Sequence, residues 1–162
     1  MSVMNTYSGR KFDPMKIAPE DVYLEDIAHA LSLVCRGGGQ IRWFYSVGQH
    51  SINCAHEALA RGWSDRMALA CLLHDASECY MSDVPRPLKQ DMARYREVER
   101  RLLQVIYEKF LGSSLTKEEE KLLKEIDDDL LWYDLEILLE EKQPGEAPRL
   151  HVDLDYTVRS FA

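Results

Sequence analysis

The sequence predicts a single, mostly α-helical domain. Apolar residues recur at helical spacing in five segments, and capping residues or glycines bound most of them. Two prolines in three residues, Pro85 and Pro87, separate the third segment from the fourth, because a helix interior does not tolerate proline. A chain of 162 residues, 46% of them hydrophobic, can bury one substantial core. We therefore expect one domain over residues 1–162, an irregular helical bundle.

The first two helices are expected at residues 20–35 and 46–61. In the first, Ile27, Leu31 and Val34 fall on one face, as in a helix packed against a core. The three glycines at 37–39 end the first helix. The second begins at Ser46, a good N-cap, and stops at Gly62.

The third and fourth helices lie on either side of the proline pair. The third begins at Ser64 and is expected to continue to about Cys79, with apolar residues on one side. The segment "SDVPRPLK" then interrupts helical structure. A long helix follows over residues 92–111 and ends at Gly112.

The last helix begins at Thr116, which forms a capping box with Glu119, and is expected to reach about residue 142. The tail "HVDLDYTV" alternates apolar and polar residues, so we expect a short strand or an extended arm that pairs with the first dozen residues. The two ends of the chain are expected to be peripheral arms, at residues 1–15 and 145–162.

Composition excludes several classes of function. The net charge of −8 disfavours nucleic-acid polymers as partners, because no strong basic patch offsets it. No apolar run approaches the roughly 20 residues that span a bilayer. The polar N-terminus lacks the hydrophobic region of a signal peptide, and the four cysteines form no C-x-x-C pair. We therefore expect a cytoplasmic protein whose cysteines are reduced and belong to the core.

The stretch "LLHDASECY" places His74, Asp75 and Glu78 in an otherwise apolar segment. Such groups are costly to bury unless something pairs them. His50 in the second helix and Asp127 in the last are further candidates that can point inward. Two imidazoles and two carboxylates suit one divalent ion such as Mn, Fe, Co, Ni or Mg, and zinc is a further candidate without a thiolate to favour it.

Alternatives weigh against this cluster of ligands. A His-Asp pair alone is weak evidence, because five histidines and many aspartates produce one by chance. Asp128 competes with Asp127 in the run "KEIDDDLLWYDLE". Of the remaining histidines, two are assigned to structural positions and one to solvent, namely His29, His56 and His151.

The order of these candidates resembles the HD-domain metal-dependent phosphohydrolase superfamily. "YSVGQHS" resembles the segment around its first ligand, and "LLHDASECYMSDVPRPLK" resembles the HDxxE and D-[IL]-P-x-P segment of the branch that includes the 5′-deoxynucleotidases. "IDDDLLWYDLEIL" resembles the helix that bears its last ligand. The similarity covers roughly residues 5–140. It implies that the metal ligands are His50, His74, Asp75 and Asp127.

The resemblance also implies roles for neighbouring residues. Glu78 matches the acidic residue that handles the attacking water, and Asp83 matches the active-site acid before the Pro-x-Pro turn. The Arg-Trp pair that holds substrate in this branch has a counterpart in Arg42 and Trp43, which stand closer to the first ligand. Cations near the motifs that can neutralise a phosphate are Arg42, Arg86 and Lys89.

The expected activity is therefore metal-dependent hydrolysis of a small phosphomonoester, above all a nucleoside or deoxynucleoside 5′-monophosphate. One alternative is an HD hydrolase of dinucleoside or guanosine polyphosphates, whose charge calls for more clustered cations than the sequence offers. Another is a helical nucleotide-binding module without catalysis. The expected partner is a small-molecule phosphate ester, with no nucleic-acid polymer and no membrane, and relatives in this branch suggest a homodimer.

Overall fold

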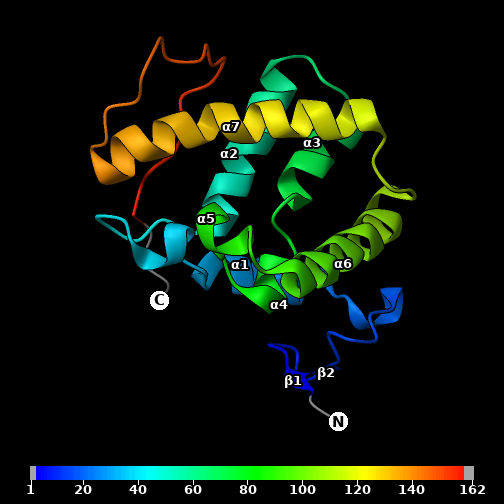
Figure 1. The fold of residues 1–162 in the computed structure, drawn as a ribbon. Helices are drawn as coiled ribbons and strands as arrows, with labels where there is room; N and C mark the ends of the chain where they lie inside the picture. The colour runs from blue at the N-terminus through cyan, green and yellow to red at the C-terminus, as the bar shows by residue number, and fades with distance from the viewer. Residues whose placement is uncertain (1–2, 159–162) are drawn as a thin grey trace.

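The computed structural model describes residues 3–158 and shows a helical domain with one very short sheet (Figure 1). The α-helices are α1 (Leu24–Leu33), α2 (Val47–Ala60), α3 (Asp65–Leu73), α4 (Glu78–Met81), α5 (Arg86–Lys89), α6 (Ala93–Leu111) and α7 (Lys117–Leu139). Two 3₁₀ helices, η1 (Pro19–Asp21) and η2 (Arg36–Gly39), flank α1. The predicted all-α class with a short β pairing is confirmed.

The predicted caps form as expected. Ser46 accepts a hydrogen bond from the N–H of Gln49, and Ser64 accepts one from the N–H of Met67. The reciprocal capping box of Thr116 opens α7. Because these side chains satisfy backbone N–H groups that a helix start leaves without partners, they determine where three helices begin.

The prediction of one continuous third helix is wrong. α3 ends at Leu73, a turn occupies residues 74–77, and the short helix α4 follows. Within this turn the N–H of Ala76 bonds the carbonyl of Leu73, and the N–H of Glu78 bonds the carbonyl of Asp75. These hydrogen bonds join residues three apart, as in a 3₁₀ helix, and wind the chain more tightly than the four-residue spacing of an α-helix. His74 and Asp75 therefore stand at a helix end.

The first and last helices are shorter than predicted. α1 starts at Leu24 because Val22 is extended and fully buried, and it stops before Val34, which is also extended. Cys35 then pairs with Ser46 in an isolated β-bridge. α7 ends at Leu139, because the next residue has a positive φ of 54°.

The short β pairing differs from the expected pairing of the two ends of the chain. β1 (Met4–Asn5) pairs antiparallel with β2 (Lys11–Phe12), so the N-terminal segment pairs with itself. Residues 151–158 form no strand. Phe12 is fully buried and stacks on Tyr80, with ring centroids 4.0 Å apart. Burial of such a ring contributes about 1.5–3 kcal/mol, so this arm is part of the core.

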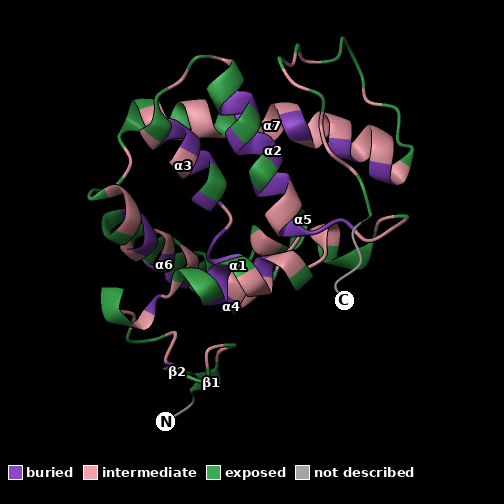
Figure 2. Ribbon diagram, turned by 180° about the vertical axis from the view of Figure 1, so that it is seen from behind, coloured by how far each residue is buried: buried purple, intermediate pink, exposed green. Residues whose placement is uncertain are grey.

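The buried apolar side chains form two clusters. In Figure 1, α7 runs across α2 and α3, while α6 lies below them beside α1 and α4. Figure 2 shows buried residues along the facing sides of these helices. One cluster includes Leu31, Leu73, Leu102 and Ile106, and the other includes Cys54, Cys71, Ile126 and Leu130. Within residues 3–158, no helix combines the length and apolarity needed to cross a bilayer.

Candidate metal centre

Three helices bring the four predicted ligands together. His50 lies on α2, His74 and Asp75 follow the end of α3, and Asp127 lies on α7. Nε2 of His50 is 3.1 Å from Oδ1 of Asp127 and 4.0 Å from Oδ2 of Asp75. Nε2 of His74 is 3.2 Å from the same oxygen of Asp75 and 3.5 Å from that of Asp127.

These spacings fit donors arranged around one ion. Donors about 2.1 Å from a metal lie about 3.0 Å apart at octahedral angles and about 3.4 Å apart at tetrahedral angles. Three of the four distances, 3.1, 3.2 and 3.5 Å, fall close to these values, and the distance from His50 to Asp75 is longer, at 4.0 Å. Nitrogen and oxygen donors in this proportion suit a divalent transition ion. The residues present therefore fit a metal.

Both imidazoles direct Nε2 toward the cluster. Nδ1 of His74 donates to the carbonyl of Cys71 at 2.7 Å, and Nδ1 of His50 lies 3.1 Å from Oδ2 of Asp134. Nε2 of His74 is buried and makes no hydrogen bond of acceptable geometry within the described chain, although two carboxylate oxygens are close. Metal-binding histidines show this pattern, in which a bond at one nitrogen leaves the other for the ion.

Electrostatics in the cluster favour a positive charge. Burial opposes ionisation of Asp75 and Asp127, but the neighbouring imidazoles hold the pKa of each carboxyl below its usual range. Burial likewise opposes protonation of both histidines. Cys54, together with Asp127 and Asp134, nevertheless raises the pKa of His50 well above the ordinary value. Asp75 and Asp127 do the same for the pKa of His74. The negative charges of the two carboxylates thus favour protonated imidazoles, and a bound cation would neutralise the same negative charges.

Asp127 rather than Asp128 faces the imidazoles. Asp128 accepts hydrogen bonds from Lys124 on its own helix and from Arg86 at 3.0 Å. Arg86 also donates to the second oxygen of Asp127 at 2.7 Å. The predicted cation Arg86 therefore stands directly beside the cluster, with about half of its side chain exposed.

The other predicted substrate residues differ in their distance from the cluster. Arg42 pairs with Glu140 at 2.7 Å. Glu140 follows the end of α7, about 20 Å along the helix axis from Asp127. Trp43 beside it is partly buried. Lys89 lies on the same short helix as Arg86, near Glu78 and Asp75, and bonds Glu99 of α6 at 2.7 Å.

The two predicted catalytic carboxyls have different surroundings. Glu78 is 4% exposed, and its Oε2 has no hydrogen-bond partner among residues 3–158. Burial, together with the charges of Asp75 and Asp83, raises the pKa of Glu78 to about 9. Asp83 accepts a hydrogen bond from the N–H of Gly37 at 2.8 Å. Asp83 thereby holds the glycine turn in which Gly37 has a positive φ.

Sequence reasoning missed Arg36, which that glycine turn presents to the site. Its guanidinium donates to Asp75 and to Asp134, each at 3.2 Å, with 13% of the side chain exposed. Burial disfavours the charge of Arg36, but the surrounding aspartates raise its pKa above the ordinary value. The sequence offered one weak signal, an arginine before three glycines, since glycines let a backbone approach a site closely.

Asp134 and Cys54 were also not assigned to the site. Asp134 is 5% exposed and accepts hydrogen bonds from His50, Arg36 and Tyr156. Cys54 was assigned to the core, and it is fully buried there, but its Sγ lies 3.5 Å from Nε2 of His50. Donor atoms of His50, Cys54 and His74 all lie within 4.8 Å of one another, so this trio could hold a metal ion. The signal for Cys54 was its i, i+4 spacing from His50.

The histidines outside the site have varied surroundings. His29 stacks on Tyr7 with ring centroids 3.6 Å apart, and His56 is exposed. His151, which was expected in solvent, has a side chain that is 41% exposed, and its Nδ1 lies 2.9 Å from the buried carboxylate of Glu57.

A cleft of about 490 Å³ opens beside two of the four candidate ligands. His74 and Asp127 line it, and so do two cations, Arg100 on α6 and Lys124 on α7. The remaining lining residues combine polar and apolar groups: Glu99, Leu103, Gln104, Tyr107, Ser114, Leu115, Glu120 and Leu123. Nonpolar surface beside a few charges is typical of small-molecule sites.

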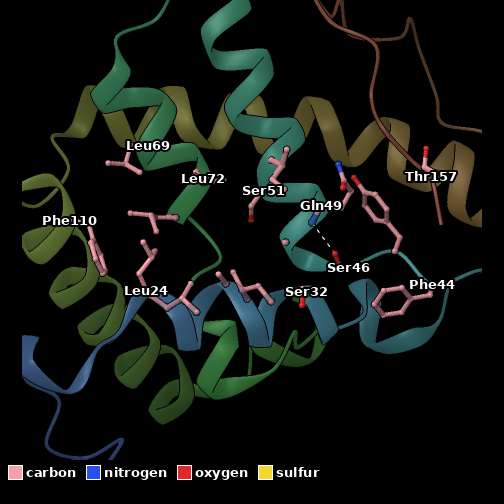
Figure 3. Close-up of a pocket in the computed structure, with 17 residues that line it drawn as sticks. Leu24, Ser32, Phe44, Ser46, Gln49, Ser51, Leu69, Leu72, Phe110 and Thr157 are labelled. Carbon is pink, nitrogen blue, oxygen red and sulfur yellow. Dashed lines mark hydrogen bonds between the residues drawn. The ribbon is translucent and has the colours of Figure 1, made fainter. Parts of the chain in front are cut away.

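A second cavity of about 510 Å³ lies between α1 and the adjoining faces of α2 and α3 (Figure 3). None of the candidate ligands lines it, and its walls are largely apolar, with Leu24, Leu69, Leu72 and Phe110 prominent in the view. Its lining contains no carboxylate, imidazole or cation. The candidate ligands and the charged side chains thus lie at the cleft beside His74, away from this cavity.

Comparison with known proteins identifies relatives but no activity. The chain is 38% identical over 110 residues to the uncharacterized protein YfdR of Escherichia coli K12, in a match that covers 68% of this chain and 59% of YfdR. It is also 38% identical over 109 residues to an uncharacterized protein of Rhodobacter capsulatus, covering 64% of this chain and 55% of that protein. The chain thus spans less than two thirds of either relative. No family model matches the chain.

Proposed function

We propose that the protein is a metal-dependent phosphohydrolase that cleaves a small phosphomonoester, with a nucleoside or deoxynucleoside 5′-monophosphate as the substrate. The observation that carries this proposal is the meeting of two imidazoles and two carboxylates from three helices, two of which, His74 and Asp127, line a cleft of about 490 Å³. That volume accommodates a mononucleotide. The resemblance of the motifs to HD-domain phosphohydrolases supports the same reading.

The proposed ligands are His50, His74, Asp75 and Asp127. A divalent ion held by them supplies Lewis-acid polarisation of a phosphoryl oxygen and lowers the pKa of a water molecule. Mn, Co, Fe, Ni and Mg suit this donor set, and zinc gains support from the nearby thiol of Cys54.

Several residues of this chain would bind and orient the phosphate. Arg86 already holds Asp127, and Arg36 holds Asp75, so both guanidiniums stand next to the ligands. Arg100 and Lys124 line the cleft farther out. We propose that these cations, rather than Arg42, neutralise the substrate's charge.

Glu78 is the proposed proton-transfer group. It is buried near Asp75, and its second oxygen has no hydrogen-bond partner in the described chain. A carboxyl with a raised pKa can give up or accept a proton near neutral pH. Because α4 begins at Glu78, the turn that breaks the third helix also sets the position of this side chain.

The cellular setting follows from the same proposal. The four cysteines are unpaired, which suits a cytoplasmic enzyme. A homodimer is the proposed assembly, and the mass of the purified protein in solution tests it.

The test compares phosphate release from the mono-, di- and triphosphates of one nucleoside, after chelation and reloading with Mn²⁺, Co²⁺ or Zn²⁺. We expect the highest kcat/KM with the monophosphate and loss of activity on chelation. A preference for the triphosphate would favour the polyphosphate alternative. Nucleotide binding without phosphate release under any metal would instead favour the non-catalytic module.

A further inference from the structure

The C-terminal segment reaches the hydrogen-bond network behind the candidate ligands. The hydroxyl of Tyr156 donates to Oδ1 of Asp134 at 2.7 Å. The other oxygen of Asp134 lies 3.1 Å from Nδ1 of His50 and accepts from Arg36. Nε2 of the same imidazole faces Asp127 at 3.1 Å. A chain of hydrogen bonds thus connects Tyr156, through Asp134, to a candidate ligand.

Two separate contacts hold this segment against α2, the helix that carries His50. Asn53 and Asp155 exchange hydrogen bonds, each 3.1 Å long, between the side-chain amide and the backbone. Glu57 accepts from the N–H of His151 at 2.8 Å. His50, Asn53 and Glu57 follow i, i+3, i+7 spacing and therefore share one helix face. The segment that delivers Tyr156 is aligned with the helix that delivers the ligand.

We propose that Tyr156 is a positioning residue of the metal centre, a proposal that rests on the metal site of the proposed function. Its hydroxyl holds Asp134 in the orientation that keeps the Nδ1–H of His50 bonded, and this orients Nε2 toward Asp75 and Asp127. A carboxylate behind a metal-binding histidine determines both the tautomer and the ring direction. Tyr156, which lies in the chain after α7, in turn fixes the orientation of that carboxylate.

The experiment compares Tyr156→Phe with Tyr133→Phe as a matched control. The hydroxyl of Tyr133 donates to the carbonyl of Pro148 at 2.7 Å, so it contacts the same C-terminal segment without reaching Asp134. Co²⁺ affinity and the visible absorption bands of bound Co²⁺ are measured for each variant in the full chain. Tyr156→Phe is expected to weaken Co²⁺ binding about 3–10-fold and to shift the bands. Tyr133→Phe is expected to stay within about twofold of the wild type.

A double-mutant cycle then tests whether the effect passes through Asp134. Asp134→Asn is expected to weaken Co²⁺ binding about 10–100-fold, and adding Tyr156→Phe to it should cause no further loss. Wild-type affinity and bands in Tyr156→Phe, or fully additive losses in the double variant, would overturn the proposal. A wild type that binds Co²⁺ but releases no phosphate overturns the proposed activity alone, because these measurements need no substrate.

Discussion

Replacing Asp127 with alanine should abolish most metal binding, whereas the same change at its neighbour should not. The two residues are adjacent on α7, yet their carboxylates have different partners. Asp127 faces the imidazoles of His50 at 3.1 Å and His74 at 3.5 Å. Asp128 bonds Lys124 and Arg86 at the surface.

The magnitude follows from these positions. Asp127→Ala removes one of the two negative charges among the proposed ligands. Mutation of a residue that only hydrogen-bonds to a metal ligand already lowers metal affinity about 10–100-fold. Loss of a ligand itself should therefore lower metal affinity by at least about 100-fold. Asp128→Ala breaks partly exposed ion pairs, which contribute about 0–1 kcal/mol, and should leave metal affinity within about threefold.

Isothermal titration of the chelated variants with Mn²⁺ or Co²⁺ measures this difference, and circular dichroism confirms that each variant folds. Wild-type affinity in Asp127→Ala would refute the ligand assignment. A large loss in Asp128→Ala, with Asp127→Ala unaffected, would move the last ligand by one residue and contradict the side-chain arrangement on α7.

Four further outcomes are expected. Glu78→Gln should keep its metal but lower kcat by about 100-fold or more, the scale of a positioned acid–base group, and an unchanged kcat would assign it to structure. Arg100→Ala should raise KM several-fold with little change in kcat, as steady-state kinetics can show, if its charge acts mainly in substrate binding. Cys54→Ser should leave Mn²⁺ affinity within about threefold, whereas loss of binding in a titration would make it a ligand and favour zinc. The chelated protein should lose thermal stability as the pH rises above about 6.5. Folding raises the pKa of both site histidines, so the stability that their protonation contributes is complete below about pH 6.5 and is lost as the pH rises through the higher pKa values of the folded state. A melting temperature that is constant with pH would contradict this.

The sequence by itself determined where several helices begin and supplied the candidate ligands of the proposed site. Local rules were sufficient for the starts of α2, α3 and α7, because a capping side chain bonds the backbone within its own first turn. They also identified His50, His74 and Asp75 as chemical candidates, since ionisable groups in apolar segments need partners. The break after Leu73 was missed because apolar periodicity continues through residues 74–79 while the backbone tightens.

Tertiary structure alone decided which polar side chains turn inward from exposed or irregular segments. Arg36 rather than Arg42 reaches the cluster, because the turn at Gly37 is held by Asp83. This turn directs the guanidinium of Arg36 between Asp75 and Asp134, and Asp134 is 98 residues away from Arg36 in the chain. Asp134 is in turn met by Tyr156, from a segment with no regular structure. Such choices depend on partners that become neighbours only when α2, α3 and α7 pack together, and periodicity along one segment carries no information about them.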